Sequence, residues 1–195
     1  MSYFTLLSEK FCYYFFVFHI GDRLLVIGGR GLNYTFLSDV ELVTPSSNND
    51  QCDPTDLNEE VYAHASVVSR EGNIVTCGGY NKNWNPSSKC QIETSTGETR
   101  FFSSMNYKRY WFGMSIINGI IYAIGGYSSS YNKMESINIK TENHWKVEAN
   151  MPFEVWSHCV VTINTKIVVI GGRNGGTSKL VSEDNILPIF NVLKL

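Results

Sequence analysis

The sequence lacks the short motifs that mark most catalytic and metal sites. None of its five cysteines belongs to a CxxC pair, which leaves little support for a zinc site. It has no HExxH motif, no Ser-centred nucleophile elbow and no phosphate-cradling glycine loop. A net charge of −2 gives no argument for binding nucleic acid or an anionic membrane. The sequence therefore predicts no enzyme activity, no cofactor and no bound metal.

Proline and long hydrophobic runs are also scarce. Five prolines beside sixteen glycines in 195 residues indicate one domain with many tight turns. The apolar run at residues 11–18 is too short to span a bilayer, so we predict no membrane span. That run is either a first strand or the core of a leader behind Lys10. The cytoplasm is the preferred compartment and secretion the alternative.

The sequence does contain a repeat. Four short apolar runs end in a double glycine, at residues 23–30, 73–80, 120–127 and 166–173. The four pairs are Gly28-Gly29, Gly78-Gly79, Gly125-Gly126 and Gly171-Gly172. They follow one another at offsets of 50, 47 and 46 residues. A nearly fixed period of this size is typical of repeat architectures.

Similar segments precede the double glycines. Residues 60–68 (EVYAHASVV) and 154–161 (EVWSHCVV) share a Val, an aromatic residue, a His and a final Val-Val. Residues 110–117 (YWFGMSII) form the same type of strand without the His. A turn follows each segment, and Asn118-Gly119 is a strong hairpin signal. Each unit therefore begins with a two-stranded hairpin whose second strand ends at the double glycine.

Two further strands are expected to complete each unit. Third strands are predicted at residues 89–95 and 134–141, where Ile137 and Ile139 alternate with polar neighbours. Fourth strands are predicted at residues 99–105 and 144–151. The first unit has a good third strand at residues 37–44, but residues 45–57 are polar and rich in turn residues. The predicted fold is all-β, built of four-stranded antiparallel meanders.

These units resemble Kelch repeats, which form the blades of β-propellers. The third unit carries the resemblance best, in Gly125-Gly126, Met134-Glu135-Ser136, Trp145 and Met151-Pro152. In the second unit, Met105, Arg109 and Phe112-Gly113 look like the junction between two such repeats. That unit departs from the pattern in two places. Phe101-Phe102 stands where Trp is usual, and Lys89-Cys90-Gln91 lacks the usual acidic residue.

The resemblance covers residues 11–182, with blades at 11–57, 58–105, 106–151 and 152–182. Residues 1–10 form an N-terminal tail and residues 183–195 a divergent C-terminal tail. Propellers of this family close with about five to seven blades. We therefore expect an incomplete or fragment propeller that needs further blades or another chain to close the ring. A four-bladed ring is the alternative.

The resemblance also implies structural roles for the glycines and for Trp145. The double glycines are expected to permit close approach of backbone near the crowded ring axis. Trp145 is expected to pack between neighbouring blades. His64 and His158 occupy matching positions, which favours a repeated structural role over a metal or catalytic pair.

The cysteines leave alternatives open. Cys77 and Cys90 are expected nearly opposite each other on neighbouring strands, where they form either a disulfide or a pair of packed thiols. The states of Cys52 and Cys159 are also open, because spacing alone does not fix connectivity.

The loops that follow the double glycines are the predicted binding site. Arg30, Tyr80, Tyr127 and Arg173 each directly follow a double glycine, and should form a ring on one propeller face. The full set of candidate partner-binding residues is Arg30, Tyr34, Tyr80, Trp84, Tyr127, Tyr131 and Arg173. Such side chains suit adaptable contacts on a rigid scaffold.

The resemblance implies a protein–protein interaction module that binds another protein through this face, for example as a substrate-recruiting adaptor. The alternative is a secreted propeller domain related to copper radical oxidases of the galactose oxidase type or to carbohydrate-associated proteins.

Overall fold

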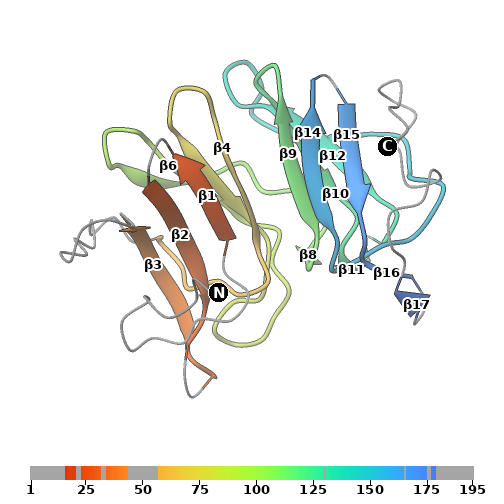
Figure 1. The fold of residues 1–195 in the computed structure, drawn as a ribbon, viewed down its shortest axis with the longest axis horizontal. Helices are drawn as coiled ribbons and strands as arrows, with labels where there is room; N and C mark the ends of the chain where they lie inside the picture. Colours follow the sequence, from red (N-terminus) through yellow and green to blue (C-terminus); the bar gives the residue numbers. More distant parts are fainter. Residues whose placement is uncertain are drawn as a thin grey trace.

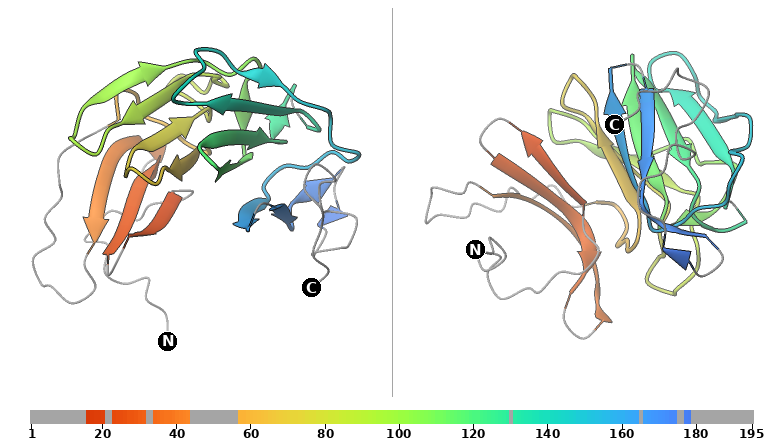
Figure 2. Two further views of the ribbon diagram at one scale, coloured as in Figure 1. Left: turned by 90° about the horizontal axis from the view of Figure 1, so that it is seen from above. Right: turned by 45° about the vertical axis from the view of Figure 1, so that its right-hand side comes forward.

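The computed structural model describes residues 16–20, 23–31, 34–43, 57–129, 131–164, 166–174 and 177–178. These residues form successive antiparallel sheets that follow one another around an open arc (Figures 1 and 2). We number the main sheets blade 1 to blade 4 in chain order. Among the described residues, no helix has the length and apolar character needed to cross a membrane.

Blade 1 has three described strands, β1 (Phe16–Ile20), β2 (Arg23–Arg30) and β3 (Phe36–Val43), in that spatial order. Residues 16–18 of the apolar run at residues 11–18 therefore belong to a strand. The double glycine lies inside β2, where the register with β3 shifts between Ile27 and Gly29. Residues 11–15, and residues 44–56 of the polar segment, lie outside the described part of the chain.

Blades 2 and 3 are the four-stranded antiparallel meanders that the sequence predicts. Blade 2 consists of β4 (Ala65–Val68), β5 (Ile74–Cys77), β6 (Cys90–Glu93) and β7 (Thr99–Phe102). Blade 3 consists of β9 (Gly113–Ile117), β10 (Ile120–Ile124), β12 (Met134–Asn138) and β13 (Lys146–Val147). The hairpin turn in blade 3 has φ values of 52° at Asn118 and 80° at Gly119, and positive φ at both residues is the type I′ requirement.

Blade 4 is described as one hairpin, β14 (Cys159–Ile163) with β15 (Lys166–Ile170). Two short pairings lie beside the main sheets: β8 (Arg109–Tyr110) with β11 (Tyr127–Ser128), and β16 (Arg173–Asn174) with β17 (Thr177–Ser178). The predicted C-terminal tail, residues 183–195, lies outside the described residues.

The hydrophobic core lies between the blades. The largest cluster joins blade 2 residues such as Val67 and Val75 to blade 3 residues such as Met114 and Ile121. Trp145 belongs to this cluster, is 3% exposed, and donates its indole N–H to the Ser103 carbonyl at 2.9 Å. Because each interface contains side chains of two blades, a blade cannot bury its faces alone.

Candidate functional site

A repeated backbone hydrogen bond connects each blade to the next. In each case the second glycine of one blade donates its N–H to a carbonyl at the start of the next blade. The pairs are Gly29 to Val61 (3.0 Å), Gly79 to Arg109 (2.7 Å) and Gly126 to Val155 (2.9 Å). The three junctions therefore share one geometry, which fixes how side chains of neighbouring blades meet.

The first glycine of each pair permits this approach. Gly78 and Gly125 have φ values of +66° and +59°, a region that disfavours other residues. A methyl group added at either position would lie 2.7 Å from the carbonyl oxygen of Arg109 or Val155, respectively. A side chain at these positions would push neighbouring blades apart.

In blades 2, 3 and 4 the residue after the double glycine pairs with an aromatic residue that lies three positions before the first strand of that blade. Tyr80 pairs with Tyr62, Tyr127 with Tyr110, and Arg173 with Trp156, all in antiparallel register. The matching positions repeat from blade to blade, so these residues lie on the same face of the arc.

On this face the rings form a continuous series of contacts, which we call the aromatic belt. Its members are Phe36, Tyr62, Tyr80, Trp84, Tyr110, Trp111, Tyr127, Tyr131 and Trp156. The belt crosses all three junctions. The ring-centroid distances there are 5.5 Å for Phe36–Tyr62, 4.1 Å for Tyr80–Tyr110 and 5.4 Å for Tyr127–Trp156.

The belt has a buried floor and a partly exposed surface. Phe36, Tyr62 and Tyr110 are less than one-tenth exposed, whereas Trp84 is 50% exposed. The other five members, Tyr80, Trp111, Tyr127, Tyr131 and Trp156, are half-buried. A contiguous, partly exposed apolar patch of this kind marks an interaction site more often than isolated apolar residues do.

An arginine lies at each end of the belt. The guanidinium carbon of Arg30 is 3.9 Å from the centroid of the Tyr34 ring and 5.7 Å from that of Trp84. Arg173 is exposed and extends from the Trp156 end. Within the described part of the chain, neither arginine forms an ion pair with a carboxylate.

Two belt tyrosines, Tyr110 and Tyr131, have raised pKa values. A hydrogen bond with Tyr127 is the main cause that raises the pKa of Tyr131 to about 12. Burial, with a smaller contribution from a hydrogen bond to Tyr80, raises the pKa of Tyr110. Both hydroxyls are therefore neutral at physiological pH and can donate hydrogen bonds.

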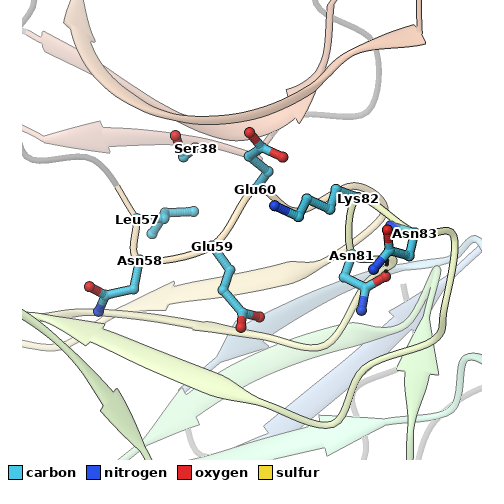
Figure 3. Close-up of a pocket in the computed structure, with 8 residues that line it drawn as sticks. All are labelled: Ser38, Leu57, Asn58, Glu59, Glu60, Asn81, Lys82 and Asn83. Carbon is cyan, nitrogen blue, oxygen red and sulfur yellow. Dashed lines mark hydrogen bonds between the residues drawn. The ribbon is translucent and has the colours of Figure 1, made fainter.

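A polar cavity of about 380 Å³ lies between blade 1 and the loops of blade 2 (Figure 3). Its lining residues are Ser38, Leu57, Asn58, Glu59, Glu60, Asn81, Lys82 and Asn83. Because Asn83 directly precedes Trp84, the cavity adjoins the exposed end of the belt. Glu59 also forms an ion pair with Lys89.

The two matching histidines lie between blades rather than on the loop face. His64 and His158 are buried, and their rings lie against Gly28 and Gly125 of the preceding blades. Desolvation lowers the pKa of each to about 4, partly opposed by hydrogen bonding to backbone. Both are neutral at physiological pH, as a structural role requires. No group of three or more metal-ligating side chains occurs among the described residues.

The structure resolves one of the open cysteine alternatives. Cys77 and Cys90 face each other across β5 and β6 and form a disulfide. Cys159 is a free, exposed thiol. Cys12 and Cys52 lie outside the described residues.

The binding candidates predicted from the sequence lie only in the loops and include four of the nine belt members. The missed members are Phe36, Tyr62, Tyr110, Trp111 and Trp156. A signal for two of them was present, because Tyr62 and Trp156 fill the same aromatic position in the two matching first strands.

Comparisons with known proteins agree with the repeat. A family model described as "Kelch motif" matches residues 108–152 and 157–182. The Kelch repeat and BTB domain-containing protein 2 of cowpox virus is 27% identical over 161 residues, which cover 80% of this chain. The Kelch repeat-containing protein kel-10 of Caenorhabditis elegans is 32% identical over 119 residues, 58% of this chain. The matched regions span 28% and 21% of these two relatives.

The fold has a solved counterpart. The structure of YjhT superposes with a TM-score of 0.71 at 15% identity, over 83% of this chain and 59% of that one. An identity this low supports the fold alone. Three findings agree on the family: four double glycines in register, meander blades joined at matching junctions, and relatives named as Kelch-repeat proteins. The chain is a Kelch-repeat β-propeller protein.

Proposed function

We propose that the chain is a protein-interaction module without catalytic activity, and that it binds its partner on the face that carries the aromatic belt. The observation that supports this most directly is the continuity of the belt across three blade junctions. Tyr and Trp are the residues that most often anchor protein interfaces, because they combine a large apolar area with a polar tip.

The surroundings of the belt are consistent with this role. A rigid floor of buried rings and backbone hydrogen bonds would hold the exposed rings in place, which lowers the entropic cost of binding. Arg30 and Arg173 at the two ends add charged contacts, and the cavity at Glu60 and Lys82 adds polar ones. A central apolar patch with a polar rim is the usual anatomy of a protein interface.

An adaptor role is the form of binding that we propose. The name of the cowpox virus relative joins Kelch repeats to a BTB domain. In such an arrangement the repeats would hold one protein while another part of the assembly engages a second one. The repeats themselves then need affinity and specificity, and no reactive group.

The test is selection of a random-peptide library on the immobilised protein, followed by measurement of affinity for the selected peptides. The test variant changes three exposed residues at once, Tyr34→Ala, Trp84→Ala and Arg173→Ala. The matched control is Phe101→Ala, which removes a ring that is equally exposed (50%) but lies on β7, away from the belt.

We expect the triple variant to lose about 2 kcal/mol or more of binding free energy, because aromatic and Arg anchors dominate interface energetics. The control should bind as the unchanged protein does. Equal affinity of the triple variant and the control for every selected peptide would refute binding through the belt.

A further inference from the structure

We infer that the aromatic belt binds an extended, proline-rich segment in the polyproline II conformation. The inference rests on the proposed function and adds the chemical class of the partner.

The shape of the belt favours an extended ligand. Its rings contact one another from Phe36 in blade 1 to Trp156 in blade 4, so the patch is long and crosses three junctions. A helix or a compact loop would cover only part of such a strip. An extended peptide can follow it from blade to blade.

The packing of the rings also gives the patch relief. Tyr127, Tyr131 and Trp156 contact one another at interplanar angles of 68°, 71° and 84°. Trp84 is likewise edge-on to Phe36 and Tyr62, at 64° and 68°. Perpendicular rings expose alternating faces and edges, and aromatic surfaces of this kind accept proline rings in polyproline II recognition.

The hydrogen-bonding groups of the belt are mainly donors. Indole and guanidinium groups can only donate hydrogen bonds. A proline-rich segment presents carbonyl acceptors and few N–H groups, since proline has none. Donor and acceptor groups are therefore complementary between the belt and such a segment.

The charges argue against an acidic segment as the main ligand. Arg30 and Arg173 lie at opposite ends of the belt, and the strip between them consists of neutral rings. The adjoining cavity is lined by Glu59, Glu60 and Lys82, and Glu59 is paired with Lys89, so it offers no net positive charge to an acidic segment. An acidic peptide would gain charge pairing only at the two ends, whereas a proline-rich one would use the whole strip.

Trp111 indicates that the middle of the belt is kept for binding. Its φ is 51°, at the position where the neighbouring blades have Ala63 and Ser157, each with a φ of 56°. A positive φ is costly for a bulky residue. The indole N–H of Trp111 is also buried without a hydrogen-bond partner among the described residues, which adds to the cost. A large ring retained at this cost is better explained by recognition than by stability.

The experiment is a titration of the full chain, followed by tryptophan fluorescence. Three synthetic peptides serve as probes: decaproline, an acidic decapeptide of Glu and Ser, and a neutral decapeptide of Gly and Ser. We expect saturable binding of decaproline, about tenfold or more tighter than either other peptide. Tighter binding of the acidic peptide, or no saturable binding of decaproline, would overturn the inference.

Variants connect the signal to the belt. Trp84→Ala and Trp111→Ala should each weaken decaproline binding by about tenfold or more, while Phe101→Ala leaves it unchanged. Melting temperatures show whether each variant folds, and we expect a smaller loss for Trp111→Ala than for the buried Trp145→Ala. If Trp84→Ala and Trp111→Ala both fold and bind decaproline as tightly as Phe101→Ala does, the belt is not the site.

The library selection separates this inference from the proposed function. Belt-dependent peptides that lack proline would leave the interaction module standing and remove the proline-rich ligand. If no belt-dependent peptide is selected and decaproline does not bind, both fail. Proline-rich peptides that compete with decaproline would support both.

Discussion

The connectors that enter blades 2 and 3 follow the same backbone path with different side chains. We call residues 57–62 connector 2 and residues 103–110 connector 3. Arg109 of connector 3 forms an ion pair with Glu135 of β12, in which both side chains are fully buried and the nitrogen–oxygen distance is 2.9 Å. Glu135 also accepts hydrogen bonds from Asn106 (2.6 and 2.7 Å) and from the Tyr107 backbone (3.3 Å).

In connector 2 an amide replaces the carboxylate. Gln91 lies opposite Thr76, as Glu135 lies opposite Ala123. Its side chain accepts from the Glu59 N–H at 3.2 Å and donates to the Glu59 carbonyl at 3.4 Å. Val61 stands where connector 3 has Arg109, and its carbonyl makes the same bond to the preceding blade. At connector 2, therefore, neutral residues replace both the arginine and the glutamate of the buried pair. No charged side chain is left buried without a partner.

The largest expected effect of a single substitution comes from breaking the buried pair on one side. Glu135→Ala leaves the Arg109 guanidinium in the core without its carboxylate, and should lower the free energy of unfolding by about 3–5 kcal/mol. Gln91→Ala, the matched change at connector 2, removes only neutral hydrogen bonds and should cost about 1–2 kcal/mol. Urea denaturation of both variants measures the difference.

A double variant sharpens the comparison. Arg109→Val with Glu135→Gln copies connector 2 into connector 3, and we expect it to recover most of the loss, because no unpaired charge remains. If the double variant is as unstable as Glu135→Ala, then the two connectors are not interchangeable and the comparison fails.

The second expected effect concerns the residues next to the double glycines. Blade 2 has the Cys77–Cys90 disulfide where blade 3 has the apolar pair Ile124 and Met134, both almost fully buried. The disulfide closes a loop with a sequence separation of 13 residues. Reduction should lower the free energy of unfolding by about 3 kcal/mol in the chain-entropy model.

The measurement is denaturation with and without a thiol reductant. The control is the double variant Cys77→Ser with Cys90→Ser, in which the reductant should have no further effect. A shift of the same size in that variant would assign the effect to other cysteines.

Most of the repeat could be predicted from the sequence, because strands and turns depend on local patterns. The double glycines, the Asn118-Gly119 turn and the alternation around Ile137 each act over a few residues. The disulfide alternative also followed from pairing the strands on either side of a loop. These features need no knowledge of how the blades sit together.

The aromatic belt could be predicted only in part, because it depends on contacts between blades. Tyr80 and Tyr127 follow double glycines and were identified, but their neighbours Tyr62 and Tyr110 appeared as ordinary strand residues. The meeting of Tyr80 with Tyr110 at 4.1 Å depends on the junction geometry. Sequence spacing within one unit does not contain that information.

The third expected effect is a loss of stability in acid. His64 and His158 occupy the position at two blade junctions that Phe112 occupies at the third. Burial lowers the pKa of both histidines to about 4. In the unfolded chain the same groups titrate near 6.5, so the unfolded state takes up protons first. The contribution of the neutral histidines to the free energy of unfolding is fully present above about pH 6.5. It is lost as the pH falls from about 6.5 to about 4, and the loss amounts to about 3 kcal/mol per histidine.

Phe112 supplies the matched substitution. His158→Phe should remove about half of the histidine contribution to the acid slope while keeping a ring between the blades. The measurement is the free energy of unfolding at several pH values between 4 and 7. An unchanged acid slope in the double variant His64→Phe with His158→Phe would show that these two residues do not cause it.

The smallest expected effect comes from the exposed counterpart of the buried pair. Lys89 and Glu59 form an ion pair beside connector 2, with 55% and 30% of their side chains exposed. Because water and salt screen such a pair, Lys89→Ala should change the free energy of unfolding by about 0–1 kcal/mol. The effect should shrink further in about 1 M salt, whereas the loss in Glu135→Ala should persist. A salt-insensitive loss of several kcal/mol in Lys89→Ala would mean that burial is not what distinguishes the two ion pairs.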